Sequence, residues 1–388
     1  MTSFSRIDKD QLRTDCRFYT GYKPCHKNDG CPGCDEYRPR GEQLLVIKLG
    51  AMGDVLRTKA ILPALKAAHP VSWIVWLTAP GSEVLARDPL VDEVRVLDTE
   101  GVFALRGRRF AKLLCLDKDA HAVRLSAELD AEQRYGFAPT LYNTITVWNE
   151  GAMEALRMGL SDELKFRLNR KPMQQIVAEC CELPWAGDRY GLEISEEARR
   201  DAAAVWDSLG LPRGRQVVGL NTGCGPVFAT KGWHADRMEE FLRDAAARED
   251  VTMLLLGGRR EETLHRHLME RAGPLAGRAV FDAGNRHSLE VFFALLERCA
   301  LVVSADTLAL HAAVALGRPV VGLFGPTSAA EVDLYGQGEK VVTDFSCAPC
   351  YLKKCPMGLP CMEALSAARV WGAAERVLAG RAGHAQPV

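Results

Sequence analysis

The feature that most constrains this fold is a repeated alternation of short apolar segments with glycine-containing turns and helical stretches. In the first unit, the apolar run at residues 44–49 leads into a turn at residues 50–54, and apolar residues then recur at helical spacing to residue 69. Strands that alternate with helices form parallel sheets covered by helices on both faces. Further strands of this first sheet are expected at residues 72–78, 93–97 and 112–116.

The same alternation begins again in the second half of the chain. Between the halves, residues 171–215 show no clear strand pattern and are interrupted by proline and glycine, so the domain junction is expected there. A helix is expected at residues 288–299, because Ser288 is a favourable N-cap. The strands expected in this half are residues 217–221, 252–256, 301–304 and 320–324.

We therefore expect an α/β protein with two doubly wound, Rossmann-like domains that face a cleft. The predicted domains span residues 41–185 and 186–345. A small Cys-rich module is expected at residues 1–40, and a second Cys-rich segment with a C-terminal helix at residues 346–388. Ligands of such sheets bind beyond the carboxyl ends of the strands, so the turns that follow the strands carry the functional argument.

The composition excludes some classes of function. With a formal net charge of -1 over 388 residues, the chain lacks the basic surface that general nucleic-acid binding needs. Its first residues contain no apolar segment typical of a secretory signal, and no apolar run approaches the length of a membrane span. A cytoplasmic location is therefore expected.

Asp54, at the end of the first turn, allows two interpretations. Aspartate is a good N-cap, and spacing alone favours this role. Because Asp54 also follows the carboxyl end of a strand, the alternative is a catalytic base that faces the cleft. The turn does not match GxGxxG, so a dinucleotide site is not expected.

Three turns of the second half carry polar residues suited to a phosphorylated ligand. Residues 221–225 are glycine-rich and are followed by Lys231. The loop and the lysine together would hold a diphosphate; the alternative is a flexible loop with a solvated lysine. Glu261 would bind ribose hydroxyls, although complementing a helix dipole is the favoured interpretation. Asp306 and Thr307 are expected at a helix N-terminus, a ready phosphate site, and His311 lies on the same helical face unless it is a packed core residue.

In this order the motifs resemble glycosyltransferase family 9, the ADP-heptose lipopolysaccharide heptosyltransferases, over roughly residues 41–375. The resemblance implies a GT-B fold and a glycosyltransferase that uses a sugar nucleotide. The motifs that carry it are GxxGD after the first strand, KxW at 231–233, GGxxE at 257–261, DTxxxH at 306–311 and GPT at 325–327.

The resemblance also implies roles for individual residues. Asp54 matches the catalytic aspartate, Lys231 the lysine that contacts the donor diphosphate, and Glu261 a contact of the donor nucleoside. This chain has Leu308 where the family usually has glycine, which removes a place where a phosphate or sugar approaches the backbone closely. The remaining donor-binding residues implied are Gly223, Asp306, Thr307 and His311.

The implied reaction is a single inverting displacement on an ADP-sugar, with no cofactor for catalysis. The implied acceptor is an anionic glycolipid, and Arg57, Arg106 and Arg109 are expected to bind its phosphates or carboxylates. The basic run at 106–112 would also attract the inner face of the cytoplasmic membrane, unless it is simply a solvated basic face. Two other functions stay open: a sugar-nucleotide epimerase or hydrolase of the same fold, and a non-catalytic metal-binding protein with a degenerate transferase fold.

Eight of the 13 cysteines fall in two clusters, one toward each end of the chain. The first cluster consists of four thiols around a Cys-Pro-Gly-Cys turn, which favours a structural zinc ion. An iron–sulfur cluster and unliganded thiols are the alternatives. Metal binding is a weaker hypothesis for the second cluster, because similar cysteine-rich tails occur in the family. The clusters are Cys16, Cys25, Cys31 and Cys34, and then Cys347, Cys350, Cys355 and Cys361.

Overall fold

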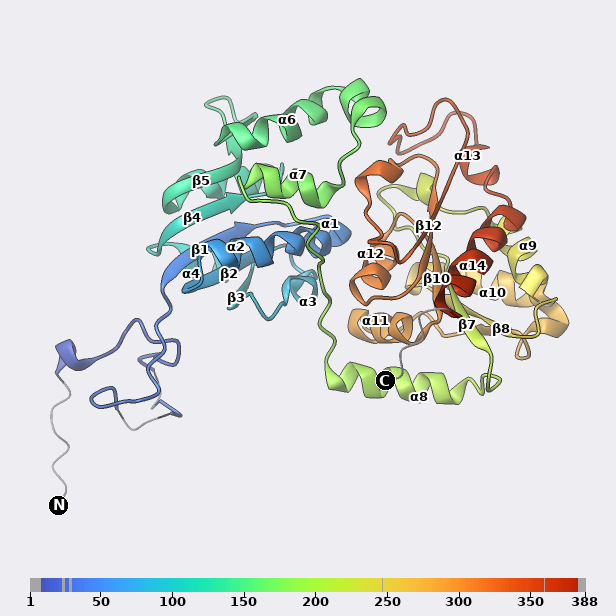
Figure 1. Ribbon diagram of the computed structural model, residues 1–388, viewed down its shortest axis with the longest axis horizontal. Coiled ribbons are helices and arrows are strands. Elements are labelled where there is room, and N and C mark those ends of the chain that lie inside the picture. The colour runs from blue at the N-terminus through green and yellow to red at the C-terminus, as the bar shows by residue number, and fades with distance from the viewer. Residues whose placement is uncertain (1–7, 23–24, 28–29, 246, 359, 383–388) are drawn as a thin grey trace, which may run out of the picture.

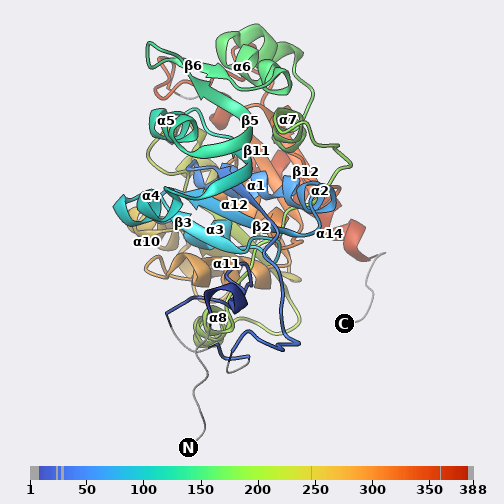
Figure 2. The same ribbon diagram turned by 90° about the vertical axis from the view of Figure 1, so that its left-hand side faces the viewer.

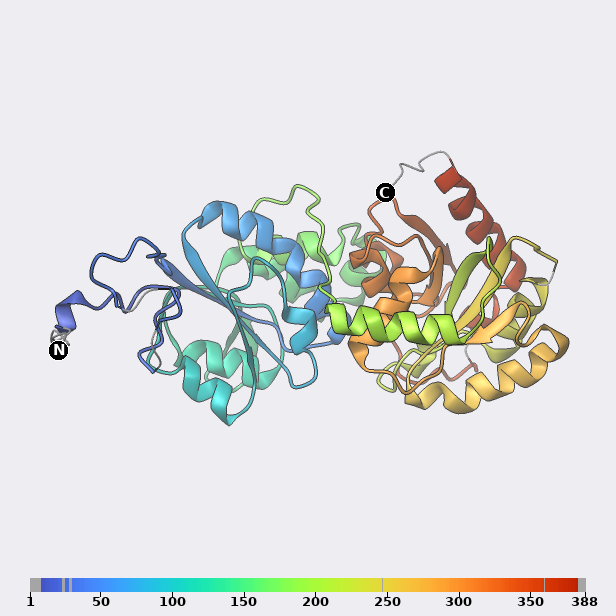
Figure 3. The ribbon, with the colours of Figure 1, turned by 90° about the horizontal axis from the view of Figure 1, so that it is seen from below.

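The computed structural model describes residues 8–22, 25–27, 30–245, 247–358 and 360–382. Within these residues the chain forms two β-sheets in succession, each covered by helices on both faces (Figures 1 and 3). The prediction of an α/β protein with two doubly wound domains is therefore confirmed.

The first sheet has the strand order β3-β2-β1-β4-β5-β6, and its neighbouring strands are parallel except for β5 and β6. Residues 44–47 of the central strand β1 are completely buried, as expected for a parallel strand covered on both faces. The strands are β1 Glu42–Ile47, β2 Ser72–Thr78, β3 Glu93–Val96, β4 Arg109–Cys115, β5 Asp130–Pro139 and β6 Ile145–Val147.

The second sheet has the strand order β12-β11-β10-β7-β8-β9 and is parallel throughout. The four strands expected from the sequence in this half match β7, β8, β10 and β11 to within one residue at each end. The strands are β7 Gln216–Asn221, β8 Val251–Leu256, β9 Val280–Asp282, β10 Leu301–Ala305, β11 Val320–Phe324 and β12 Gly338–Val342.

The helices connect these strands and cover the two sheets. In the second half, α8 packs on α11, and the C-terminal helix α14 packs along β10, β11 and β12. The helices that precede β7 are α1 Met52–Thr58, α2 Leu62–Ala68, α3 Glu83–Ala86, α4 Thr99–Leu105, α5 Ala120–Glu128, α6 Met153–Leu160, α7 Met173–Cys180 and α8 Glu196–Ser208. Those that follow are α9 Ala235–Ala245, α10 Glu262–Ala272, α11 Leu289–Arg298, α12 Leu308–Ala315, α13 Pro360–Glu363 and α14 Ala367–Ala382.

The helical stretch expected after Asp54 is interrupted. A 3-10 turn at Lys59–Ile61 separates α1 from α2. Pro63 explains the break, because proline has no N–H to donate to an earlier turn but is tolerated in the first turn of a new helix. Among the helices of the described residues, none is both long and apolar enough to cross a membrane.

Candidate active site

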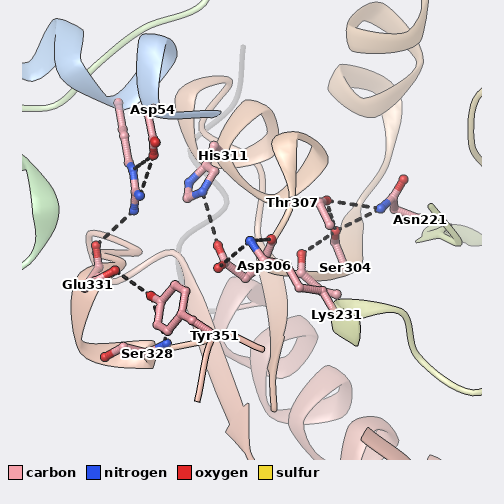
Figure 4. A network of polar contacts seen from close by, with 12 residues as sticks. Asp54, Asn221, Lys231, Ser304, Asp306, Thr307, His311, Ser328, Glu331 and Tyr351 are labelled. Atoms are coloured by element: carbon pink, nitrogen blue, oxygen red, sulfur yellow. Dashed lines mark hydrogen bonds and ion pairs between the residues drawn. The ribbon is translucent and has the colours of Figure 1, made fainter. Parts of the chain in front are cut away.

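The turns that follow β1 and β10 lead into α1 and α12, and these two helices are in contact at the boundary between the domains (Figure 1). The contact brings Asp54 of the first domain close to Asp306 and His311 of the second (Figure 4). Residues that are about 250 positions apart in the sequence therefore meet at one place.

Gly53 allows His311 to lie against the backbone of α1. A Cβ atom at position 53 would come within 2.6 Å of His311 Cδ2, closer than real Cβ contacts. Gly53 does not have a positive φ angle. This glycine is therefore required by a contact between the domains and not by the conformation of the turn.

Asp54 lies in the first turn of α1, but the N-cap of that helix is Ala51, so the interpretation of Asp54 as the N-cap is wrong. Its carboxylate accepts two hydrogen bonds from Arg57, over 3.0 Å from Nε and 2.6 Å from Nη2. The side chain of Asp54 is 34% exposed and lines a cavity. This position fits a base that is held in place and still reached by a substrate.

The charge of Asp54 is fixed by its neighbours. Burial raises the pKa of the carboxyl, but Arg57 and Lys48 outweigh burial and hold the pKa at about 2. Asp54 is therefore ionised at neutral pH and free to accept a proton, although a carboxylate with so low a pKa is a weak base.

Asp306 connects Lys231 to His311. Lys231 Nζ lies 3.0 Å from the backbone oxygen of Asp306 and 3.2 Å from its Oδ2. His311 Nε2 lies 3.3 Å from Asp306 Oδ1. Burial raises the pKa of Asp306, but His311 and Lys231 outweigh it and hold the pKa far below its usual range.

His311 is placed to act as a neutral side chain. Burial lowers the pKa of its imidazole and Arg57 lowers it further, although Asp306 opposes both effects. The contact with Asp306 assigns the proton to Nε2. Nδ1 is then an acceptor, and it has no hydrogen-bond partner within the described residues.

Thr307 is the N-cap of α12, which confirms the prediction that Asp306 and Thr307 stand at a helix N-terminus. Its hydroxyl lies 3.0 Å from Ser304 Oγ and 3.3 Å from Asn221 Nδ2. This cluster joins β7 to β10 and fixes the start of α12 (Figure 4). Leu308, in place of the family glycine, is the first residue of the helix and packs partly against the core.

Glu261 and Gly223 come from neighbouring strand ends and lie together. A Cβ atom at position 223 would come within 2.8 Å of the Glu261 carboxyl carbon. The Glu261 carboxylate also accepts a hydrogen bond of 2.9 Å from the backbone N–H of Gly258. Glu261 thus organises its own turn and also faces the glycine-rich loop.

Two of the three arginines expected to bind the acceptor lie away from Asp54 in the fold. Arg106 and Arg109 lie at the end of α4 and the start of β4, whereas the site lies beyond the carboxyl ends of the strands. They are exposed and pair with Glu128 and Glu132. Arg57 is close to the site, but its guanidinium is already occupied by Asp54 and by the backbone oxygen of Glu331, at 3.2 Å.

A cavity of about 690 Å³ adjoins Asp54 and contains cationic side chains that the sequence analysis missed. Lys118 donates to the backbone oxygen of Ala155 at 2.9 Å and forms no ion pair within the described residues. Burial lowers its pKa, and Lys165 and Lys48 lower it further. Lys118 lies three residues after the end of β4, so its place beyond a strand end was a signal in the sequence.

Asp117, the neighbour of Lys118, stabilises the turn between β1 and α1. Its Oδ2 accepts hydrogen bonds from the backbone N–H groups of Leu49 and Gly50, at 3.0 and 3.1 Å. It also accepts one from Lys48 Nζ at 3.2 Å. One carboxylate beyond β4 therefore fixes the turn that follows β1.

Tyr351 links the second cysteine-rich segment to this site. Its hydroxyl donates to Glu331 Oε2 over 2.6 Å and accepts a hydrogen bond from the backbone N–H of Ser328 (Figure 4). The tyrosine ring stacks on Phe166 of the first domain and lies 4.1 Å from Lys165 Nζ. The segment thus touches both domains beside the cavity.

The comparisons with known proteins agree with this geometry. Residues 168–360 match glycosyltransferase family 9 (heptosyltransferase). Over 344 residues the chain is 30% identical to lipopolysaccharide heptosyltransferase 1 of Pseudomonas aeruginosa, which covers 81% of this chain and 87% of that protein. This chain belongs to glycosyltransferase family 9. The enzyme is therefore a glycosyltransferase.

Solved structures show the same fold. A family 9 glycosyltransferase from Veillonella parvula superposes with a TM-score of 0.71 at 20% identity, covering 87% of this chain and 98% of that one. The E. coli heptosyltransferase WaaC with ADP-2-deoxy-2-fluoro heptose gives a TM-score of 0.56 at 18% identity, covering 86% and 99%. The family 9 enzyme described here therefore has the two-domain GT-B arrangement that the family resemblance implied.

The contact at Gly53 predicts a kinetic defect. Replacing Gly53 by alanine should lower kcat/KM by about tenfold or more, because the added Cβ displaces His311 and shifts one domain against the other. Steady-state kinetics and the melting temperature should be measured together. Gly191→Ala is the matched control, because a Cβ at this exposed position meets nothing within 4 Å. Equal kinetics in both variants would contradict the assignment.

The Arg57 ion pair predicts a change in pH dependence. Asp54 acts only when ionised, and its pKa of about 2 keeps it ionised throughout the usual assay range. In Arg57→Gln the positive charge that lowers the pKa of Asp54 is lost, so burial raises this pKa. The acidic limb of the kcat/KM profile should therefore move to higher pH. Arg57→Lys keeps the charge and should move the limb less. An unchanged limb in Arg57→Gln would refute the electrostatic role.

Proposed function

We propose that this enzyme transfers a heptose from ADP-heptose to the core of a lipopolysaccharide, with inversion at the anomeric carbon. The observation that carries the proposal is the meeting of ionised Asp54 with Lys231, Asp306 and His311 at one domain boundary. The relatives support the choice of sugar: one is named a lipopolysaccharide heptosyltransferase, and WaaC was solved with an ADP-heptose analogue.

In this scheme Asp54 accepts the proton of an acceptor hydroxyl as that oxygen attacks the anomeric carbon. The bond from the anomeric carbon to the diphosphate oxygen breaks, and ADP leaves. Lys231 and the N-terminus of α12 offset the negative charge that develops on the diphosphate. Because Asp54 has a low pKa, it accepts the proton late, when the hydroxyl has become acidic through bond formation.

The donor nucleoside would lie over the second sheet. Glu261 faces Gly223 beyond β7 and β8, where a carboxylate is well placed to accept hydrogen bonds from ribose hydroxyls. The diphosphate would then lie at the start of α12, beside the cluster formed by Thr307, Ser304 and Asn221.

The acceptor would enter the cavity of the first domain. Its walls combine apolar side chains such as Phe137 and Met158 with Lys118 and Lys165. Lys118 has no carboxylate partner in the part of the chain that the structure describes, so a phosphate or carboxylate of the acceptor would supply the negative charge. We therefore propose that Lys118 and Lys165, rather than Arg106 and Arg109, bind the acceptor anion.

Contact with the membrane that carries a glycolipid acceptor is also proposed for the first domain. Leu141 and Tyr142 are 98% and 89% exposed in the connection between β5 and β6. Leu160, at the end of α6, is also exposed. Figure 2 shows α6 and β6 at the same end of the domain. Exposed apolar side chains of this kind are suited to the headgroup region of a bilayer.

The first test of the function is Asp54→Asn. This variant should lose transfer by about a hundredfold or more, because an amide cannot accept the proton, while the affinity for ADP stays unchanged. Product formation and donor consumption should be measured with and without acceptor. Asp201→Asn, an exposed position of α8, is the control. Donor consumption that needs no acceptor would favour an epimerase or hydrolase over a transferase.

The assignment of the acceptor site has its own test. Lys118→Ala and Lys165→Ala should each raise the KM for the acceptor by about tenfold, the loss expected for a charge-assisted contact, and leave the KM for the donor unchanged. Arg106→Ala and Arg109→Ala are the matched controls, because these arginines lie at the opposite end of β4. A larger effect in the arginine variants would reverse the assignment.

A further inference from the structure

The N-terminal cysteine-rich segment has almost no core of its own. Its described residues lie at the end of the molecule farthest from the second domain (Figures 1 and 3). They contain a 3-10 turn at Lys9–Gln11 and a single β-bridge between Cys16 and Pro39. In the described part of this segment, Cys16 is the one buried apolar side chain. Something other than apolar burial must therefore give the segment its shape.

The four cysteines of the segment surround one small cavity. Cys16, Cys25, Cys31 and Cys34 all line a space of about 30 Å³, together with aromatic side chains. Cys31 and Cys34 stand at the ends of a tight turn, in which the Cys34 N–H donates to the Cys31 carbonyl over 3.2 Å. Gly33 has the positive φ of 68° that such a turn requires. This turn directs two thiols toward the same side.

We propose that these four cysteines bind a single structural zinc ion. Four thiolates with a Cys-x2-Cys pair are a ligand set that zinc prefers. All four cysteines line the same small cavity, which favours one shared ion. As they stand, no three potential ligands within the described residues are close enough to share an ion. Zinc would therefore draw the sulfurs inward, and each thiol would release its proton to solvent as it binds.

The zinc would order the contact that attaches the segment to the first domain. Arg17, next to Cys16, donates to Asp92 over 2.5 Å and to the backbone oxygen of Ser72 over 3.0 Å. The guanidinium groups of Arg17 and Arg40 both lie over the ring of Trp73, at 5.2 and 4.6 Å. A metal that fixes Cys16 would thus also fix Arg17.

This attachment places the zinc away from the chemistry. Ser72 begins β2 and Asp92 precedes β3, so the segment rests at the amino ends of these strands. The candidate active site lies beyond the carboxyl ends. We therefore assign the zinc to folding and attachment of the segment and give it no role in sugar transfer.

The first experiment measures bound metal in the full-length protein. Wild type should contain about one zinc per chain that is lost in Cys31→Ser/Cys34→Ser, while kcat and both KM values stay within twofold. The matched control is Cys347→Ser/Cys350→Ser, a Cys-x2-Cys pair in the other cluster, which should keep this zinc. Metal-free wild type, or equal zinc in wild type and the Cys31→Ser/Cys34→Ser variant, would overturn the proposal.

A second measurement does not depend on the variant folding. In native wild type, Cys16, Cys25, Cys31 and Cys34 should resist alkylation and react once a chelator has removed zinc, as read by mass spectrometry of the peptides. Equal alkylation before and after chelation would refute the site. Disulfide-linked peptides, or visible absorption of an iron–sulfur cluster that disappears with these cysteines, would also refute it.

Discussion

The arrangement of the site depends on the buried guanidinium of Arg57. Its partners come from both domains: the Asp54 carboxylate on the same helix, and the backbone oxygen of Glu331 across the boundary. A buried charge is costly unless its hydrogen-bonding groups are satisfied. The contact between the domains therefore completes the hydrogen bonding of Arg57. The ion pair of Arg57 with Asp54 sets the charge of the proposed base.

Glu331 extends this dependence into the C-terminal part of the chain. Its carboxylate is buried and accepts the hydrogen bond of Tyr351, whose pKa is raised by burial and by Glu331, so the tyrosine remains a donor. Tyr351 in turn stacks on Phe166 of the first domain. Asp54, the domain boundary and the second cysteine-rich segment are thus joined by one continuous set of contacts.

Much of the fold was predictable from the sequence, because buried parallel strands appear as continuous apolar runs and ligand-binding residues follow them. The place of Asp54 and Asp306 beyond strand ends was predicted in this way, whereas the roles of Asp54, Asp306 and His311 were implied by the family resemblance. Arg106 and Arg109 precede the strand predicted at 112–116, so the sequence already indicated that they lie at its amino end, away from the strand ends where ligands bind. Glu331 and Tyr351 could not be found, since their roles arise only when the two domains meet. Lys118, three residues after β4, was not singled out from the sequence, although its place beyond a strand end was a signal.

The packing of His311 on Gly53 has a consequence for the geometry of the cleft. Since a Cβ atom does not fit between them, the backbone of α1 and the side chain from α12 are already in van der Waals contact. The imidazole therefore works as a spacer whose thickness sets how far apart the two sheets stand at this point. The size of one side chain therefore contributes to the width of the gap that an acceptor oxygen must cross to reach the anomeric carbon.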